Sequence, residues 1–480
     1  MAVCCLLVFA FQKATLAQDA QSVANTQPDS ASASSPTATT SSGAQTSPDA
    51  SSSSAVELPP ICPEDANCQP SDPPQIIELP CHPGPCPVPT PLPTPTPAPP
   101  PTAPSCARTI TADVVAFDIV YFYNRFGAFN PAGMMYALKR DVVGTTPGNV
   151  QLRPGKRPRP IALRVNEGDC LEVTFTNLLS PTRPNNNSTF TRTASMHVNG
   201  MDYVRDVDLD DGANVGRNES SLAAPGQTRT YKWYAAKQGQ YLMYSMGAPA
   251  GGEGDGGQPV LGLFGSINVE PKNARWYRSQ VTAAQLQAAT TGTNPNGTPI
   301  INYEATYSDG TPILNILRGN EIVHSDLNAI ITGFTEDCAD APPSGICGLP
   351  FREFTVVFHD EAKVVQAFPE LDAELFHGVR DAFPINYGSG GLGAIVLANR
   401  KRVGPSKNCN ECKFEEFFLE SHPNGDPALI VRKDSLGNAV EALFPDDPSN
   451  VHHSYLNDPV RFRNTHAGPK ETHVFHLHAH

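Results

Sequence analysis

Four histidines in the segment THVFHLHAH have the residue type and spacing of metal ligands: His473, His476, His478 and His480. Neutral imidazole is a preferred ligand of copper, zinc, iron and nickel. The intervening apolar residues exclude a homopolymeric cloning tag. In an extended strand successive side chains point to opposite faces, so His476, His478 and His480 share one face and His473 lies on the other. One strand could therefore serve two metal positions, with further ligands supplied from elsewhere.

Other candidate ligands are weaker. A CxxC pair, Cys409 and Cys412, has no second pair at zinc spacing, which favours a structural disulfide or loop clip over a zinc site. An acidic run could hold a hard cation but lacks the distal Glu of an EF-hand loop, which favours a solvated acidic turn. This run consists of Asp206, Asp208, Asp210 and Asp211. The isolated histidines are expected to be surface or satisfied core residues, namely His324, His359, His377 and His422.

Composition divides the chain. Residues 1–18 have the apolar stretch and small-residue end of a secretory signal peptide. Residues 19–105 are rich in Ser, Thr, Ala and Pro and predict a disordered tail that ends in a polyproline linker.

The net charge of −14 and the lack of a basic patch exclude a nucleic-acid partner, and no apolar run is long enough for a membrane span. Ten cysteines beyond the first five residues are compatible with disulfides in an oxidising compartment, whose pairing the sequence does not give.

The elements that must position the histidines are strands. Residues 108–127 are rich in Val, Ile, Phe and Tyr, and residues 161–179 alternate apolar and polar side chains around a Glu-Gly-Asp turn, which predicts a half-buried hairpin. Residues 228–245 repeat this arrangement, and residues 260–271 predict a closing strand. We therefore expect a β-sandwich over 106–272.

The second half of the chain is less regular. A helix is expected over 274–289 within a linker of residues 273–296, and a second, truncated domain over 297–480. Its last strand runs into the terminal histidines without a closing strand.

The segment HVFHLHAH resembles the third copper motif of multicopper oxidases, His-Pro-x-His-Leu-His-Gly-His, with Val474 and Ala479 at the Pro and Gly positions. ASMHVNGM and YLMYSMG occupy the places of the first and second motifs of that family. FNPAGMMYALKRDVV, GGEGDGGQ, FEEFFLESHPNGDPALIV and HAGPKETHVFHLHAH are similar to the large bacterial oxidases implicated in manganese oxidation. The resemblance covers about residues 106–480 and implies an all-β fold of cupredoxin-like Greek-key β-sandwich domains.

The resemblance also implies roles for the histidines. His473 would bind type 1 copper, His476 type 2 copper and His478 a type 3 copper, whereas His480 would lie beside the ligands without binding. His197 stands at the first ligand position of the first motif, as a metal ligand or as a structural residue. The other three ligand positions of the first two motifs carry Asn199, Tyr244 and Met246.

The expected function is that of a copper-dependent oxidase that couples one-electron oxidation of a substrate to the four-electron reduction of dioxygen. Mn(II) is the expected reductant, with Fe(II), Cu(I) or phenolics as alternatives. The His-Cys-His motif of the family is missing, so the chain as given is expected to be inactive without the remaining C-terminal domains of the same protein. A secreted, periplasmic or extracellular location is expected. The competing hypothesis is a non-catalytic copper-binding or structural cupredoxin protein.

Overall fold

The computed structural model describes most of the expected first domain and parts of the second. These residues are 103–122, 128–186, 188–217, 219–248, 257–334, 347–359, 365–366, 384–388, 399–402, 405–408, 430–433, 439–442, 447–448 and 452–468. They all belong to one compact unit, Thr102–His480. The expected signal peptide (1–18), all but the last three residues of the expected disordered tail (19–105) and the four terminal histidines lie outside the described residues.

The largest sheet is built around one long strand, β1. It pairs antiparallel with β2 and parallel with β6, and the sheet continues through β9 to β8. At the other edge β16 pairs parallel with β1 and carries β15, while β19 pairs with β2. The strands are β1 (Thr109–Phe122), β2 (Ala128–Leu138), β6 (Cys170–Asn177), β8 (Asp202–Tyr203), β9 (Thr228–Tyr234), β15 (Leu317–Arg318), β16 (Glu321–Ile322) and β19 (Val365–Gln366).

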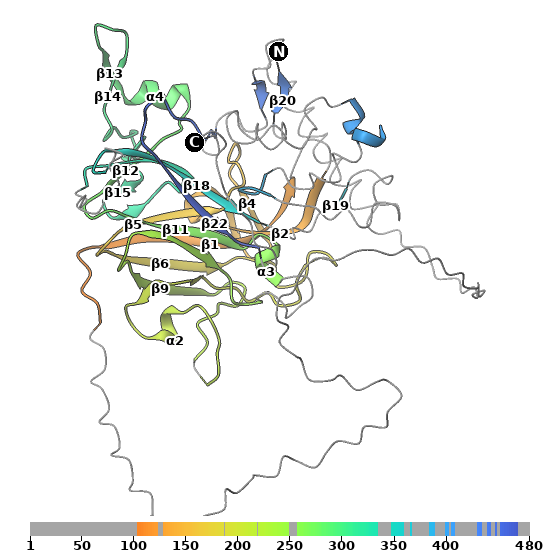
Figure 1. Cartoon of the computed structure of the whole chain (residues 1–480). Helices are drawn as coiled ribbons and strands as arrows, with labels where there is room; N and C mark the ends of the chain where they lie inside the picture. The colour runs from red at the N-terminus through yellow and green to blue at the C-terminus, as the bar shows by residue number, and fades with distance from the viewer. Residues whose placement is uncertain are drawn as a thin grey trace, which may run out of the picture. The chain divides into compact units, whose positions relative to one another are not determined.

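Two four-stranded sheets complete the main body (Figure 1). One has the order β5-β11-β10-β7 and packs its apolar face against the large sheet in a common core. The other has the order β12-β17-β18-β22. Their strands are β5 (Ile161–Asn166), β7 (His197–Val198), β10 (Gly239–Tyr244), β11 (Phe264–Glu270), β12 (Arg275–Arg278), β17 (Asn328–Thr332), β18 (Phe351–Phe358) and β22 (Val460–His466).

Short two-stranded ribbons and short helices lie outside these sheets. The two-stranded ribbons are β3 (Val142–Thr146) with β4 (Asn149–Leu152), β13 (Thr290–Thr293) with β14 (Pro299–Ile301), and β20 (Ile430–Lys433) with β21 (Ala439–Ala442). The short helices are α2 (Val207–Asp210), α3 (Gly257–Val260) and α4 (Ala283–Ala289), with 3-10 turns at Lys139–Asp141 and Pro405–Asn408. None of the helices in this described part of the chain has the length and apolar character that crossing a bilayer requires. The described residues confirm the expected all-β class of packed sheets.

Both expected hairpins are wrong, although their strands are correct. β5 and β6 flank the Glu-Gly-Asp turn but lie in different sheets, β5 beside β11 and β6 between β1 and β9. The chain crosses in the same way from β9 to β10. The physical reason is that a short polar turn allows two strands either to pair edge to edge or to pack face to face. The alternating apolar residues of both strands meet across the sandwich core.

The expected helix over 274–289 is only partly correct. Trp276 and Tyr277 are buried in strand β12, which pairs antiparallel with β17. The helix α4 begins only after Thr282, whose hydroxyl accepts a hydrogen bond from the Gln285 backbone N–H at 3.2 Å. The Gln285 side chain accepts in return from the Thr282 N–H at 3.0 Å. This capping box fixes the start of α4, and the aromatic pair before it belongs to the third sheet.

Candidate metal centre

The positions of the first two motifs meet at the edge of the second sheet. His197 in β7 is the antiparallel partner of Tyr244 in β10. Their rings lie edge to face with centroids 5.3 Å apart, and the Tyr244 hydroxyl is 3.5 Å from the Asn199 side-chain oxygen. Two segments 47 residues apart in the chain are thus neighbours.

The ring of His197 is oriented by the backbone. Its Nδ1 lies 2.5 Å from the carbonyl oxygen of Asp211. A carbonyl only accepts hydrogen bonds, so Nδ1 carries a proton there. Histidines that bind metals commonly donate their other ring N–H in this way. His197 could therefore bind a metal only through Nε2, which lies 3.2 Å from the Asn199 side-chain oxygen, so that oxygen would have to move away from the ring.

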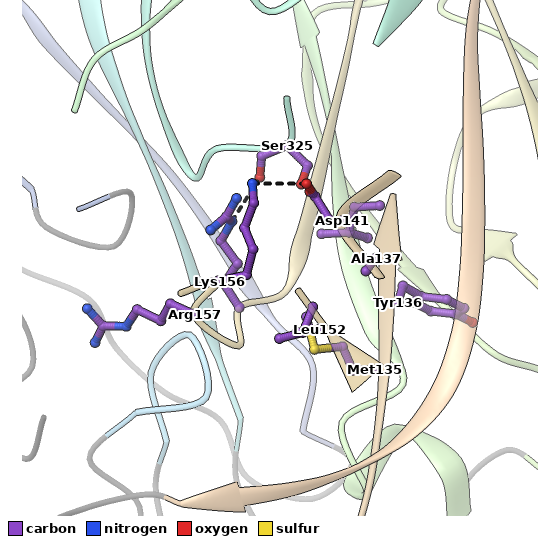
Figure 2. Close-up of a pocket in the computed structure, with 10 residues that line it drawn as sticks. Met135, Tyr136, Ala137, Asp141, Leu152, Lys156, Arg157 and Ser325 are labelled. Carbon is purple, nitrogen blue, oxygen red and sulfur yellow. Dashed lines mark hydrogen bonds and ion pairs between the residues drawn. The ribbon is translucent and has the colours of Figure 1, made fainter. Parts of the chain in front are cut away.

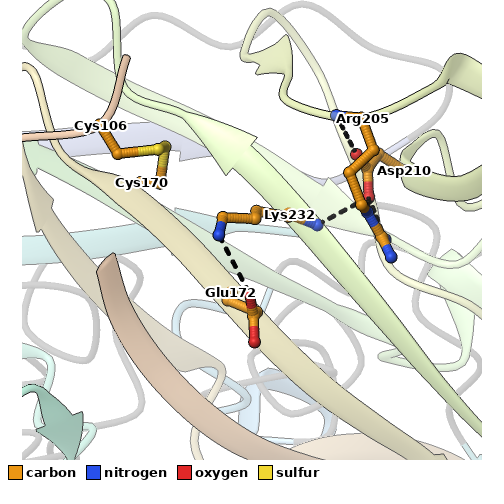
Figure 3. Close-up of a disulfide and its surroundings, with 6 residues drawn as sticks. All are labelled: Cys106, Cys170, Glu172, Arg205, Asp210 and Lys232. Atoms are coloured by element: carbon orange, nitrogen blue, oxygen red, sulfur yellow. Dashed lines mark hydrogen bonds and ion pairs between the residues drawn. A yellow bond between two sulfur atoms is a disulfide. The ribbon is translucent and has the colours of Figure 1, made fainter. Parts of the chain in front are cut away.

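The acidic loop after β8 holds His197 in place, and the expectation of a solvated turn is wrong for half of it. Asp210 is completely buried, and its carboxylate accepts from the backbone N–H groups of Arg205 at 2.9 Å and of Lys232 at 2.8 Å (Figure 3). The Arg205 guanidinium also donates to it, at 3.0 Å from Nε. Trp233 Nε1 donates to the Asp210 carbonyl at 2.9 Å. The loop is therefore fixed to β9.

The neighbouring Asp211 fixes the following part of the loop by hydrogen bonds. Its Oδ1 accepts from the Ser221 hydroxyl at 2.5 Å and from the Ala213 N–H at 2.9 Å. Its carbonyl remains for His197. The two buried aspartates thus shape the loop, while Asp206 caps α2 by accepting from the Asp208 N–H. The sequence feature that could have indicated this loop is Gly212, directly after the two aspartates. A glycine at that position is typical of a tight turn rather than of a cation site.

The isolated histidines that the structure describes have structural environments. His324 donates from Nε2 to the Pro312 carbonyl at 2.9 Å. Burial and the nearby Arg278 lower the pKa of His324 to about 4, so its ring is neutral. His359 is buried and packs edge to face on Phe264, with ring centroids 4.9 Å apart. His377 and His422 lie outside the described residues, as do Cys409 and Cys412.

A small pocket opens beside β2, β4 and β5 (Figure 2). Its charged lining is already engaged in ion pairs. Lys156 Nζ lies 2.9 Å from Asp141, and Arg159 NH1 lies 2.6 Å from Asp447. The pocket is therefore a junction that ties the β4–β5 connection to the second half of the chain.

The terminal histidines His473, His476, His478 and His480 lie outside the described residues, and their expected roles stay predictions. Strand β22 leads toward them and pairs parallel with β18, from Val460 opposite Arg352 to His466 opposite Phe358. Within the described part of the chain, no group of three or more His, Cys, Asp or Glu side chains could hold a metal ion. A metal bound through His197 would need its other ligands from residues beyond that part.

Comparisons with known proteins found partial similarities. The chain matches no protein-family model. It is 31% identical over 137 residues to a curated protein of Kuenenia stuttgartiensis described as a probable nitrite reductase-hydroxylamine oxidoreductase fusion protein. The match covers 28% of this chain and only 13% of that protein.

Solved structures similar to this chain include a copper nitrite reductase from Nitrosomonas europaea, at 22% identity and a TM-score of 0.21, covering 34% of this chain and 42% of that one. A multi-copper oxidase from Pseudomonas thermotolerans is similar at 18% identity and a TM-score of 0.23, covering 43% and 42%. The chain thus spans less than half the length of each of these proteins.

Proposed function

We propose that this chain is part of a copper-dependent oxidoreductase whose copper ligands include His473, His476 and His478. The observation that carries the proposal is the spacing of these histidines, which would place them on two faces of an extended strand in the pattern of a copper motif. The curated relative described as a probable nitrite reductase fusion supports the same class.

Each histidine has a proposed role. His473 binds type 1 copper, His476 type 2 copper and His478 a type 3 copper, and bound copper would accept electrons singly from the substrate and deliver them to dioxygen. His197 is the proposed further ligand, because the Asp211 carbonyl already orients its ring through Nδ1, and Nε2 would bind the metal in place of its contact with Asn199. The protein's contribution would be to hold these imidazoles in a fixed orientation.

The proposed reductant is Mn(II), and dioxygen is the proposed acceptor. Fe(II), Cu(I) and phenolics are the alternatives within the same reaction type, and the rest of the same protein is the proposed source of the missing type 1 ligands. Nitrite is a second candidate acceptor, favoured by the description of the curated relative. The disulfide Cys106–Cys170 supports a secreted or periplasmic location, because such bonds persist in oxidising compartments.

The test uses the product of the complete natural reading frame, loaded with copper. Oxygen uptake is followed with Mn(II), Fe(II), Cu(I) and a phenol, and nitrite consumption is followed with a reduced electron donor. The proposal expects oxygen uptake that His476→Ala abolishes and His480→Ala largely retains. Equal losses in the two variants would refute the role assignment.

The rival hypothesis is a non-catalytic copper-binding cupredoxin protein. It predicts that the complete protein binds copper through the same histidines but turns over neither dioxygen nor nitrite with any reductant. Copper content measured on the same preparations separates the two hypotheses, since both require bound copper and only one requires turnover.

A further inference from the structure

A layer of buried polar side chains, here called the polar seam, lies between the β5-β11-β10 sheet and the β18-β22 pair. One face of β11 carries Ser266, Asn268 and Glu270, and Arg164 of β5 is the register partner of Asn268. These four side chains are 0% exposed, as are Glu353 and Thr355 on β18. Packed sheet faces are normally apolar, and buried charges are costly unless they are paired and hydrogen-bonded.

Glu353 is the fully satisfied carboxylate of the seam. Its Oε1 accepts from Arg164 Nε at 2.9 Å and from Asn268 Nδ2 at 2.8 Å, and its Oε2 accepts from Arg463 Nε at 3.0 Å. Burial alone would raise the pKa of Glu353, but Arg164, a side-chain hydrogen bond with Glu270 and Arg463 together outweigh it and hold the pKa below its usual range. Glu353 is therefore ionised at neutral pH.

Glu270 has a different environment on the same layer. Its Oε2 accepts from Arg463 NH2 at 3.1 Å, the guanidinium that Glu353 also uses. Its Oε1 is buried and has no hydrogen-bond partner among the described residues. Burial first, and then the neighbouring Glu353 charge, raise the pKa of Glu270 well above its usual value.

The side chains around Glu270 lack a hydrogen-bond donor rather than an acceptor. Gln240 of β10 donates through Nε2 to the Ser266 hydroxyl at 3.0 Å, which leaves its own Oε1 buried and without a partner in the described structure. Gln240 stands opposite Asn268, two residues from Glu270 on β11, a diagonal separation that long side chains can span. A carboxylate can only accept, whereas a protonated carboxyl group adds one donor.

We propose that Glu270 is a buried proton-binding group that keeps its proton in the folded protein, and that release of this proton loosens the contact between the two sheets. The charged and titratable groups that act on it are Arg164 of β5, Glu353 of β18 and Arg463 of β22. The Lys272–Glu167 pair, 3.4 Å apart, lies at the more exposed end of the same strands.

The sign of the pH effect follows from the two pKa shifts. Because the pKa of Glu270 is raised in the fold, its stabilising contribution is complete below the usual pKa of a glutamate, declines as the pH rises above that value, and is gone above the raised pKa. Because the pKa of Glu353 is lowered, its contribution is complete above the usual value and is lost as the pH falls toward the lowered pKa. The seam is therefore most stable in mildly acidic solution.

The test compares the full chain with Glu270→Gln, Glu353→Gln and the control Glu321→Gln, whose surface ion pair with Arg318 is 40% and 48% exposed. Urea unfolding is measured from pH 5 to pH 9. As the pH rises, the unfolding equilibrium constant of the wild type should increase more steeply than that of Glu270→Gln. The difference between the two slopes should be at most about tenfold per pH unit, the value for release of one proton. Glu321→Gln should follow the wild-type pH dependence. Glu353→Gln should be destabilised about 100-fold or more, because it removes the carboxylate that pairs with the fully buried Arg164 guanidinium.

Two results would overturn the proposal. One is a wild-type pH slope that Glu270→Gln retains; the other is a loss in Glu270→Gln at neutral pH as large as that in Glu353→Gln, which would mark Glu270 as an essential carboxylate. An independent readout needs no variant to fold well. Infrared difference spectra of the wild type between neutral and alkaline pH should show the loss of a buried carboxylic acid C=O band, and absence of this band counts against a protonated Glu270.

Discussion

Asp210 shows at the residue scale how a single carboxylate organises the loop beside His197. It is completely buried and receives two backbone N–H groups and one guanidinium. Replacing it by Ala leaves those donors unsatisfied, which costs about 1–3 kcal/mol for a buried polar group. We expect Asp210→Ala to lower the free energy of unfolding by about 2 kcal/mol or more in urea titrations.

Asp202→Ala is the matched control, because Asp202 is an exposed aspartate on the neighbouring β8. Its effect should lie within about 0.5 kcal/mol of zero. Similar losses in both variants would show that burial and hydrogen bonding do not distinguish Asp210.

The sequence predicted apolar core residues better than buried polar ones. Ile161, Leu163 and Val165 were expected to face a core and do so. The alternation also implied that the intervening Arg164 faces solvent, yet Arg164 is 0% exposed. A sequence shows that a strand has two faces but not that a third sheet covers the second one, so the polar seam could not be predicted.

At the scale of elements, strands were predictable and their pairing was not. The residue patterns of β5, β6, β9 and β10 correctly indicated strands, but each pair joined by a short turn is divided between two sheets. Pairing depends on contacts with strands far away in the sequence, such as β1 with β6 and β5 with β11. Local periodicity carries no information on those partners.

Gly212 is the position where the loop around His197 tolerates no side chain. Its φ is +66°, and a Cβ would lie 2.3 Å from the Met196 carbonyl oxygen, next to His197. Gly216 has a similar φ of +63° and open space around a Cβ. Comparing alanine substitutions at Gly212 and Gly216 therefore separates the cost of the left-handed backbone from the cost of a steric clash.

We expect Gly216→Ala to cost about 1 kcal/mol from the left-handed backbone alone. Gly212→Ala should cost at least about 2 kcal/mol more, because backbone atoms must also move. Chemical denaturation of both variants measures the difference. Equal costs would contradict the close approach between the loop and β7.

At the scale of the whole molecule, one disulfide ties the start of the folded unit to the large sheet. Cys106 precedes β1, and Cys170 begins β6, 64 residues later (Figure 3). Cross-linking a loop of this length removes unfolded-chain entropy that corresponds to about 4 kcal/mol. We expect the double variant Cys106→Ser/Cys170→Ser to lose about 2–4 kcal/mol of unfolding free energy.

Reduction of the wild type provides the comparison for that prediction. A reducing agent should move the unfolding midpoint of the wild type toward that of the double variant while leaving the variant unchanged. An oxidised wild type no more stable than the variant would show that the bond adds nothing to this fold.

The candidate site was predictable only where a sequence motif specified it. The spacing of the terminal histidines predicts a metal site, whereas the pairing of His197 with Tyr244 emerged only from the structure. The roles of Asp210 and Asp211 were not predictable, because burial of an acidic loop depends on how α2 packs on β9. The sequence does not distinguish a solvent-exposed aspartate from a buried one.

Copper bound per chain is the measurement that tests the central claim most directly. The purified full chain is equilibrated with copper, freed of loosely bound metal by a competing chelator and analysed by elemental mass spectrometry. The comparison includes the triple variant His473→Ala/His476→Ala/His478→Ala and the control His453→Ala, an exposed histidine outside the motif. We predict retained copper in the wild type and in the control, and its loss in the triple variant. Equal copper in the wild type and the triple variant would contradict the assignment of the terminal histidines as ligands.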